Sequence, residues 1–212
     1  MAHKPIKDQC RQGLIPYLQR ALDNIPDTGP LVMLDAGCGS GIPTVALAGR
    51  FDGHIYGLDP DAAAIESLRQ AFAARNWQHR LTTQLNMLEI NAFQPDSFDL
   101  ILAEGLLNIT GFDTGFAILD HWLKPEGWCI LHDEFKNQDE KFRLMQNTGY
   151  SMLYTELLDE HCWWNSYYSC LEAQLKQAHD TQLYATEHAE LEMFRQQPSL
   201  FRSVYYVVRK NK

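Results

Sequence analysis

Short apolar runs alternate with segments of helical periodicity along most of this chain. Seven runs predict β-strands, because they are rich in Val, Ile, Leu, Tyr and Phe and end at acids, glycines or turn residues. They lie at residues 32–36, 54–59, 80–85, 97–103, 129–134, 150–155 and 203–208. Such runs, separated by helices, are typical of an α/β fold with a mostly parallel sheet and helices on both of its faces.

Helical periodicity fills most of the gaps between these strands. The segment between the third and fourth strands is the exception, because residues 88–95 lack the pattern of a full helix. The helices are expected at residues 42–48, 62–74 and 136–147.

Two helical segments lie outside this alternation. Residues 1–28 place apolar positions at helical spacing, and Gly13 and Pro16 divide them into two helices that cover the sheet. Residues 158–200 form an insertion before the last strand that is far longer than a hairpin needs. Its two helices are expected near residues 161–178 and 180–196, ended by Pro198.

A glycine-rich turn joins the first strand to the next helix. Residues 35–41 read Asp-Ala-Gly-Cys-Gly-Ser-Gly, and Pro43 fits the first helical turn, where its missing N–H costs nothing. Glycines let the backbone reach positive φ or approach a ligand closely. Asp35 ends the strand at the edge where open α/β sheets bind ligands. Ile42 stands where the dinucleotide fingerprint needs its third glycine, which argues against a nicotinamide cofactor.

A second acid, Asp59, ends the next strand. A carboxylate there can accept hydrogen bonds from both hydroxyls of a ribose, and such charge-assisted bonds are about twice as strong as neutral ones. The structural alternative is the N-cap of the following helix, a position that Asp61 fits at least as well. At the tip of the third strand, Asn86 can accept a hydrogen bond through its amide oxygen, and Met87 either packs on a base or belongs to the core.

Three segments resemble a known family. Residues 35–41 look like motif I of the class I S-adenosylmethionine-dependent methyltransferases. Residues 103–112, with Glu-Gly after the fourth strand and Asn-x-x-Gly-Phe behind it, resemble a narrower group of small methyltransferases of unknown substrate. Residues 123–128 resemble the turn before the fifth strand of this family, with Glu126 in place of its first glycine. The resemblance implies a Rossmann-like, seven-stranded sheet.

The same resemblance implies S-adenosylmethionine as the cofactor. It implies that the amino acid tail lies along the glycine turn, the ammonium near Asp35 and the ribose at Asp59. It also implies that the adenine amino group lies at Asn86, where the family usually has Asp. The implied cofactor-binding residues are Asp35, Gly37, Cys38, Gly39, Gly41, Asp59, Pro60, Asn86, Met87 and Glu104.

Methyl transfer from a sulfonium mainly requires that the reacting atoms be oriented, because the donor is already activated. Glu104 is the first candidate for a base that deprotonates the acceptor, or for a ligand of the cofactor's amino group, and His132 is a weaker candidate. The aromatic helix of the insertion either forms a substrate lid that excludes water or packs as core. The candidate substrate residues are Asn108, Trp163, Trp164, Tyr167 and Tyr168.

The overall composition limits the classes of molecule that the protein is expected to bind. The 212 residues fit one domain, and their net charge of −9 without a dense basic run argues against nucleic acids and anionic membranes. No segment has the length of a signal core or a membrane span, so a cytoplasmic location is expected. A small molecule is therefore the expected methyl acceptor, and a homodimer through the aromatic helices stays open.

The five cysteines contain no Cys-x-x-Cys pair. They are expected to be the reduced thiols of a cytosolic protein, with Cys38 in a turn and Cys129 in a core strand. The alternative is a thiol site for a metal or for arsenic, built from Cys162 and Cys170. No other metal site is predicted.

The sequence thus predicts an enzyme that transfers a methyl group from S-adenosylmethionine to a small-molecule acceptor by in-line displacement. An oxygen, nitrogen or sulfur acceptor fits equally well. The alternative is a methyltransferase-like module that binds the cofactor, or nothing, and works through protein contacts; Asn86 is its support in the sequence.

Overall fold

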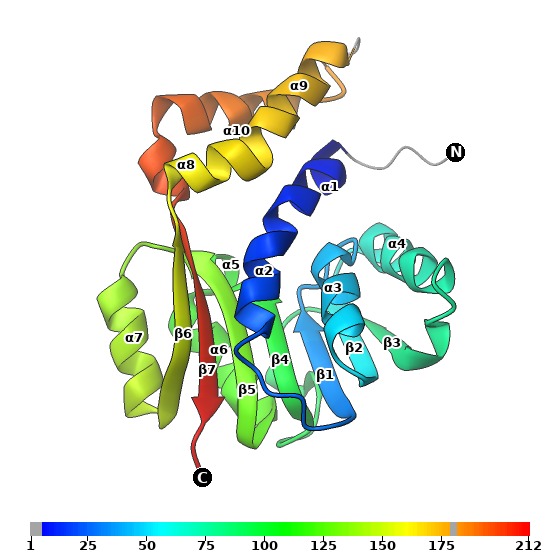
Figure 1. Cartoon of the computed structure of the whole chain (residues 1–212), viewed down its shortest axis with the longest axis vertical. Coiled ribbons are helices and arrows are strands. Elements are labelled where there is room, and N and C mark those ends of the chain that lie inside the picture. Colours follow the sequence, from blue (N-terminus) through cyan, green and yellow to red (C-terminus); the bar gives the residue numbers. More distant parts are fainter. Residues whose placement is uncertain (1–5, 179–181) are drawn as a thin grey trace.

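A computed structural model describes residues 6–178 and 182–212 as one seven-stranded sheet with helices around it (Figure 1). The strand order is β3-β2-β1-β4-β5-β7-β6. β7 runs antiparallel to both of its neighbours, and the other ladders are parallel. This confirms the predicted mostly parallel α/β sheet. The strands are β1 (Leu31–Ala36), β2 (Gly53–Asp59), β3 (Leu81–Leu85), β4 (Phe98–Glu104), β5 (Leu123–Glu134), β6 (Tyr150–Leu158) and β7 (Ser203–Lys210).

Helices cover both faces of the sheet, because apolar side chains leave the buried strands in both directions. On one face, α2, α3 and α4 contribute Leu18, Leu47 and Leu68 to a continuous core. On the other face, α6 and α7 contribute residues such as Trp122 and Met145. The helices of this body are α2 (Ile15–Leu22), α3 (Ile42–Arg50), α4 (Ala62–Ala73), α5 (Leu107–Thr110), α6 (Phe112–Trp122) and α7 (Gln138–Asn147).

The two irregular connections behave as their sequences indicate. Between β3 and β4 there is only a 3-10 turn, Ile90–Ala92, as the missing helical pattern predicts. β5 starts earlier than predicted, and residues 124–127 bulge out of its ladder with β4, since Phe98 pairs with Leu123 and Leu100 with Trp128. Glu126 adopts φ 64° in this bulge, a conformation that favours glycine, which is the residue that the resembled turn has at this position.

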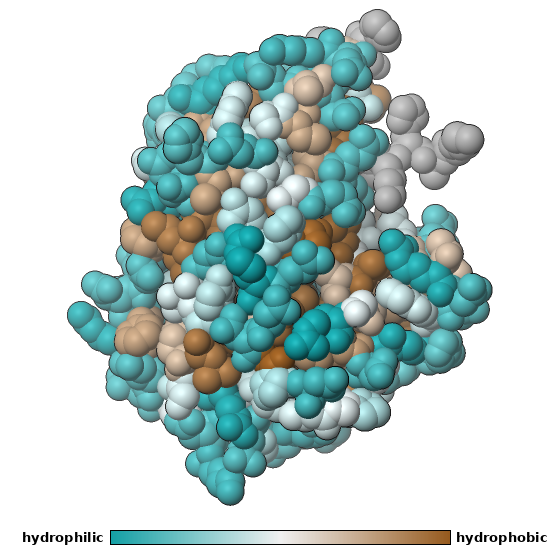
Figure 2. Space-filling view, viewed as in Figure 1, coloured by the Kyte–Doolittle hydropathy of each residue, from teal (hydrophilic) through white to brown (hydrophobic). Residues whose placement is uncertain are grey.

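The insertion forms a helical cap above the end of the sheet where the parallel strands finish (Figure 1). Its first predicted helix is interrupted, because a π-helical turn, Trp164–Tyr168, separates α8 (Glu160–Trp163) from α9 (Ser169–Gln177). Its second helix, α10 (Ala185–Gln196), begins later than expected, and residues 179–181 lie outside the described residues. Figure 2 shows hydrophobic residues gathered between this cap and the sheet, below a mainly hydrophilic outer surface.

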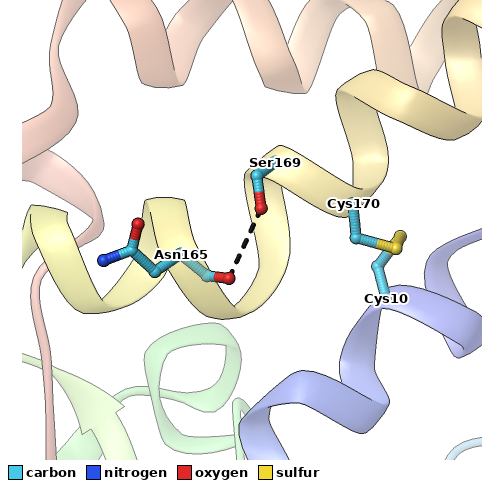
Figure 3. The surroundings of a disulfide bond; sticks show 4 residues. All are labelled: Cys10, Asn165, Ser169 and Cys170. Carbon is cyan, nitrogen blue, oxygen red and sulfur yellow. Dashed lines mark hydrogen bonds between the residues drawn. A yellow bond between two sulfur atoms is a disulfide. The ribbon is translucent and has the colours of Figure 1, made fainter.

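The N-terminal helix α1 (Ile6–Arg11) packs against the cap and is tied to it covalently. Cys10 and Cys170 form a disulfide with their Cα atoms 5.4 Å apart (Figure 3). Further along the same segment, a Cβ on Gly13 would overlap the carbonyl oxygen of Ser166, so the two backbones touch. The expectation of five reduced cysteines is therefore wrong for this pair. The partners are 160 positions apart, and sequence alone does not give disulfide connectivity.

The other three cysteines are free; Cys129 lies buried in a core strand and Cys38 lies in a turn, both as predicted, and Cys38 is buried as well. The alternative thiol site at Cys162 and Cys170 is wrong, because Cys170 is bonded to Cys10. No group of three or more His, Cys, Asp or Glu side chains within the described ranges could hold a metal ion. None of the helices in this part of the chain combines the length and apolar composition that a membrane crossing requires.

Candidate functional site

A cavity of about 780 Å³ lies between the ends of the parallel strands and the helical cap. Its floor comes from the loops after β1, β2, β3 and β4 and from the facing ends of β5 and β7. Its roof comes from α2, the preceding 3-10 turn Gln12–Leu14 and the cap. The predicted site residues that line it are Asp35, Gly37, Cys38, Gly39, Asp59, Pro60, Met87, Glu104, Asn108 and Trp163.

The glycine turn leaves main chain open to this cavity. Gly39 has φ 51°, and a Cβ added to it would meet no atom within 4 Å, so the space above it is free for a ligand. Gly41 allows close packing of two helices, since a Cβ there would lie 3.2 Å from the Cα of Leu68 and push α3 away from α4. Gly41 therefore supports the turn from behind and does not line the cavity. The Cys38 thiol also points away, toward Gly57 of β2, so Cys38 contributes main chain to the wall.

Asp35 is fixed by the helix that follows the turn. Thr44, in the first turn of α3, donates a 2.6 Å hydrogen bond from its hydroxyl to Oδ2 of Asp35. Burial raises the pKa of Asp35 to about 7, against the lowering effect of this bond, and the nearby acids Glu104 and Asp59 raise it further. A cation bound beside Asp35 would lower this pKa and favour the charged carboxylate.

Asp59 points toward the glycine turn, as a ribose-binding role requires. Its Oδ2 accepts a 2.8 Å hydrogen bond from the N–H of Gly39, and its Oδ1 accepts one of 2.8 Å from the N–H of Asp61. The alternative N-cap role belongs to Asp61, which accepts from the N–H groups of Ala63 and Ala64 at the start of α4. Asp59 is therefore free of that task and forms part of the cavity wall.

The two residues that follow β3, Asn86 and Met87, differ in how well they match their predicted positions. The structure does not bring Asn86 to the cavity wall, because its Oδ1 turns back to accept a 2.8 Å hydrogen bond from the N–H of Met87. Met87 is 63% exposed at the mouth of the cavity, which rules out the core alternative for this side chain. The adenine contact predicted for Asn86 thus has no support in this conformation.

Glu104 lies at the end of β4 and contacts the last strand. Tyr205 of β7 donates a 2.6 Å hydrogen bond from its hydroxyl to Oε1 of Glu104. Burial raises the pKa of Glu104 to about 7, although the bond from Tyr205 and the charge of Arg11 lower it. A carboxyl group with this pKa can act as a base near neutral pH.

A stack of three rings forms the wall beside Glu104. His132 lies parallel to Tyr205 with ring centroids 4.1 Å apart, and Trp163 of the cap stacks on its other side at 6.0 Å. The Ser203 hydroxyl accepts from the indole N–H of Trp163 and shares a 2.7 Å hydrogen bond with Nε2 of His132. Burial lowers the pKa of His132 to about 3, so its ring is neutral at physiological pH.

Three of the aromatic residues predicted for the substrate site lie elsewhere. Tyr167 and Tyr168 are buried in the core of the cap with α1, and Trp164 stacks on Phe194 of α10. The structure thus corrects their assignment as substrate residues, and only Trp163 of this cluster reaches the cavity. The physical reason is that the cap needs its own apolar core, and an aromatic stripe at helical spacing supplies it.

Several cavity residues were not predicted. The N-terminal segment contributes Arg11, Leu14, Ile15 and Leu18, although the sequence marks this segment only as an amphipathic cover. Others come from the distal cap and β7, where no motif marks them: Met193, Leu200, Phe201, Arg202, Ser203 and Tyr205.

A second hollow of about 970 Å³ lies between α2, α3 and α4. It is lined mainly by small and amide side chains, and it meets the first cavity behind Ser40 and Ile42. It contains neither Glu104 nor Asp59, so the chemistry belongs to the first cavity.

Comparison with known proteins agrees with this geometry. Residues 33–127 match the model of a methyltransferase domain family. The chain is 30% identical over 146 residues to a ribosomal protein L11 methyltransferase of Gloeobacter violaceus, covering 68% of this chain and 43% of that protein. It is 26% identical over 119 residues to an uncharacterized protein of Haemophilus influenzae, covering 54% and 47%. The chain thus spans less than half the length of these curated relatives.

Solved structures share the whole fold at low sequence identity. The [4+2]-cyclase SpnF has a TM-score of 0.79 and 16% identity, covering 93% of this chain and 81% of that one. A methyltransferase of Geobacter sulfurreducens in complex with S-adenosylhomocysteine has a TM-score of 0.69 and 15% identity, covering 92% and 89%. The strand order and the glycine turn agree with the family match, and residues 33–127 thus belong to the methyltransferase domain family.

Proposed function

We propose that this protein binds S-adenosylmethionine in the cavity and transfers its methyl group to a small-molecule acceptor. The observation that carries the proposal is the convergence of Asp35, Asp59 and Glu104 around the open main chain at Gly39. Asp59 offers a carboxylate to a ribose, and Asp35 and Glu104 offer acidic groups to a cationic amino acid tail. The residues present therefore fit the cofactor that the family uses.

The chain's own part in the reaction is mainly to hold and orient. When bound, the cofactor supplies an activated methyl group on a sulfonium, so proximity and alignment supply much of the acceleration, roughly 7–11 kcal/mol in favourable cases. The cap and α2 close the cavity over the strand ends and exclude water. Glu104 takes a proton from an acceptor that must lose one, and Tyr205 holds its carboxyl group in place.

The position of the cavity below the cap supports a small-molecule acceptor. Its walls include Trp163 of the cap and Asn108 of α5, which supports an acceptor position between the cap and β4. A similar fold occurs in a putative sarcosine dimethylglycine methyltransferase of Galdieria sulphuraria, with a TM-score of 0.75, 14% identity, and 94% and 85% of the two chains covered. The name of the Galdieria sulphuraria protein refers to small acceptors, whereas the L11 methyltransferase is named for a protein acceptor.

Calorimetry with S-adenosylmethionine and S-adenosylhomocysteine tests the first half of this proposal. We expect both to bind at micromolar concentrations. No binding of either below the millimolar range would rule out the proposed function.

A module that binds the cofactor without methyl transfer is the second candidate. The similarity to a [4+2]-cyclase favours it, because the same fold carries a protein named for another reaction. Release of S-adenosylhomocysteine during a screen of metabolite acceptors separates the two: turnover supports the enzyme, and binding without turnover supports the module. The homodimer through the cap stays a prediction, which light scattering checks.

A further inference from the structure

The mouth of the cavity carries an unusual share of exposed apolar surface. Large hydrophobic side chains that remain strongly exposed are few in the described ranges, and four of them line this one cavity. They are Met87 (63% exposed), Ile109 (78%), Met193 (55%) and Leu200 (63%). Such side chains gathered at one opening mark a surface that a ligand covers.

Three of these side chains surround the acceptor side of the opening. Ile109 belongs to α5, Met193 to α10, and Leu200 to the 3-10 turn Pro198–Phe201. Met87 follows β3 instead, on the side where the family resemblance implies the adenine. We call Ile109, Met193 and Leu200 the apolar rim. Because Ile109 lies far in sequence from Met193 and Leu200, local helix packing does not account for all three lining one cavity.

Further apolar side chains belong to the same cavity wall. Trp163, Phe201 and Leu14 line the cavity together with the apolar rim and Glu104. The hydroxyl of Tyr205 is directed to Glu104, so the ring presents mainly carbon to the cavity. A ligand that fills this space therefore needs an apolar body and one polar end.

Arg11 is one of two arginines in the cavity wall, which also holds five acids. Under the proposed function, Asp35 and Asp59 face the cofactor. Arg11 has no ion-pair partner in the part of the chain that the structure describes, and its charge acts on Glu104, whereas Arg202 is ion-paired. Arg11 would therefore stabilise negative charge that develops on an acceptor beside Glu104.

We propose that the methyl acceptor is an apolar weak acid, a phenol or a thiol, whose apolar body covers Ile109, Met193 and Leu200. This proposal rests on the proposed function and names its substrate class. The hydrogen of the acceptor's O–H or S–H group passes to the carboxylate of Glu104. The oxygen or sulfur then forms a bond to the methyl carbon while the bond from that carbon to the sulfonium breaks. The products are a methyl ether or thioether, S-adenosylhomocysteine and protonated Glu104.

Acceptor series of increasing apolar length test this proposal. The probes are 4-alkylphenols and 1-alkanethiols with one to eight added carbons, and glycine and ethanolamine as hydrophilic amines. We expect kcat/KM, measured from S-adenosylhomocysteine release, to rise with chain length until the apolar rim is covered. A flat response in both series, or a preference for the amines, would overturn the proposal.

Variants of the apolar rim make the test specific. Ile109→Ser and Leu200→Ser are each expected to lower kcat/KM for the longest probe roughly 10-fold, with little effect on the shortest one. Leu153→Ser is the matched control, because Leu153 is exposed on β6 and does not line the cavity. Equal losses for short and long probes would contradict a contact with the acceptor's body.

The affinity for S-adenosylmethionine separates this proposal from the proposed function. We expect Ile109→Ser and Leu200→Ser to bind the cofactor as the unchanged protein does. A protein that binds the cofactor but methylates no phenol or thiol refutes the acceptor class alone. A protein that does not bind the cofactor refutes both.

Discussion

Asp59 and Asp61 show at the scale of single residues how position decides the task of an acid. Asp59 accepts hydrogen bonds from the N–H groups of Gly39 and Asp61 and lines the cavity, whereas Asp61 caps α4. Only two positions separate them, yet the first serves a ligand site and the second serves a helix. Each role leads to a different response to substitution.

We expect Asp59→Ala to lower the affinity for S-adenosylmethionine by about 10- to 100-fold, because a charge-assisted hydrogen bond contributes roughly 1.5–3 kcal/mol. Asp61→Ala is the matched control, expected to cost about 1 kcal/mol of folding free energy as a lost N-cap and to leave the affinity nearly unchanged. Calorimetry and urea unfolding measure the two effects. Equal affinity losses for both variants would contradict the division of roles.

Glu104→Gln separates the two roles open to Glu104. A lost base lowers kcat by roughly 10²- to 10⁴-fold while the cofactor still binds. A lost ligand of the cofactor's amino group lowers the affinity instead. We expect both effects, with the larger loss in kcat. Single-turnover kinetics with saturating S-adenosylmethionine measures the rate, and calorimetry measures the affinity.

Tyr205→Phe tests the same site through its pH dependence. A base must be deprotonated, so kcat/KM for S-adenosylmethionine, which reports the protein before the cofactor binds, should rise with pH through about 7, the pKa of Glu104. The hydrogen bond from Tyr205 lowers that pKa, so its removal is expected to shift the midpoint upward. An unchanged midpoint would show that the titrating group is another one.

Local signals predict some site residues well and others not at all. Asp35, Asp59 and the glycine turn could be predicted, because strand, turn and helix follow one another directly in the sequence. Tyr205 could not be distinguished from Tyr206, since both lie in one apolar strand and both are buried. Only the placement of β7 beside β5 pairs His132 with Tyr205 and brings that ring to Glu104.

At the scale of elements, the strands and helices of the body follow from periodicity, but their lateral order does not. The pattern of residues 203–208 predicts a strand equally well at the edge or between two others. β7 in fact lies between β5 and β6, and this brings Ser203 to the cavity. The disulfide between the cap and α1 could not be predicted either, because no local sequence pattern indicates a contact between residues 160 positions apart.

The disulfide between α1 and α9 has a measurable consequence for stability. A cross-link over such a long loop restricts the unfolded chain, and a typical contribution is about 2–4 kcal/mol. We expect reduction, or Cys170→Ala, to lower the free energy of unfolding by this order in urea titrations. Cys162→Ala serves as the control, because Cys162 is a free thiol of the same cap. Equal stability of the oxidised and reduced proteins would contradict the prediction.

The whole molecule places two acids in surroundings that oppose their charge. The sheet, the cap and α1 together enclose Asp35 and Glu104, and burial is the largest cause that raises each pKa to about 7. Their ordinary values are 3.8 and 4.5. No single element produces this environment, which is why the sequence predicts the acids but not their protonation.

Between these ordinary values and about 7, the folded protein without ligand binds more protons than the unfolded chain. Its stability is therefore expected to fall as the pH rises through that window, and the contribution of both groups is complete only below their ordinary pKa values. A cationic ligand has the opposite effect on proton binding by the folded protein, because it favours the charged carboxylates.

Binding of S-adenosylmethionine at pH 6 should therefore release up to one proton from each of the two acids, and its affinity should rise between pH 6 and pH 8. Calorimetry in buffers of different ionisation enthalpy measures the released protons directly, because the apparent enthalpy then depends on the buffer. Glu104→Gln should abolish the proton release from Glu104 and leave the proton release from Asp35. An apparent enthalpy that is the same in all buffers at pH 6 would mean that the two acids are already charged, or that the cation binds away from them.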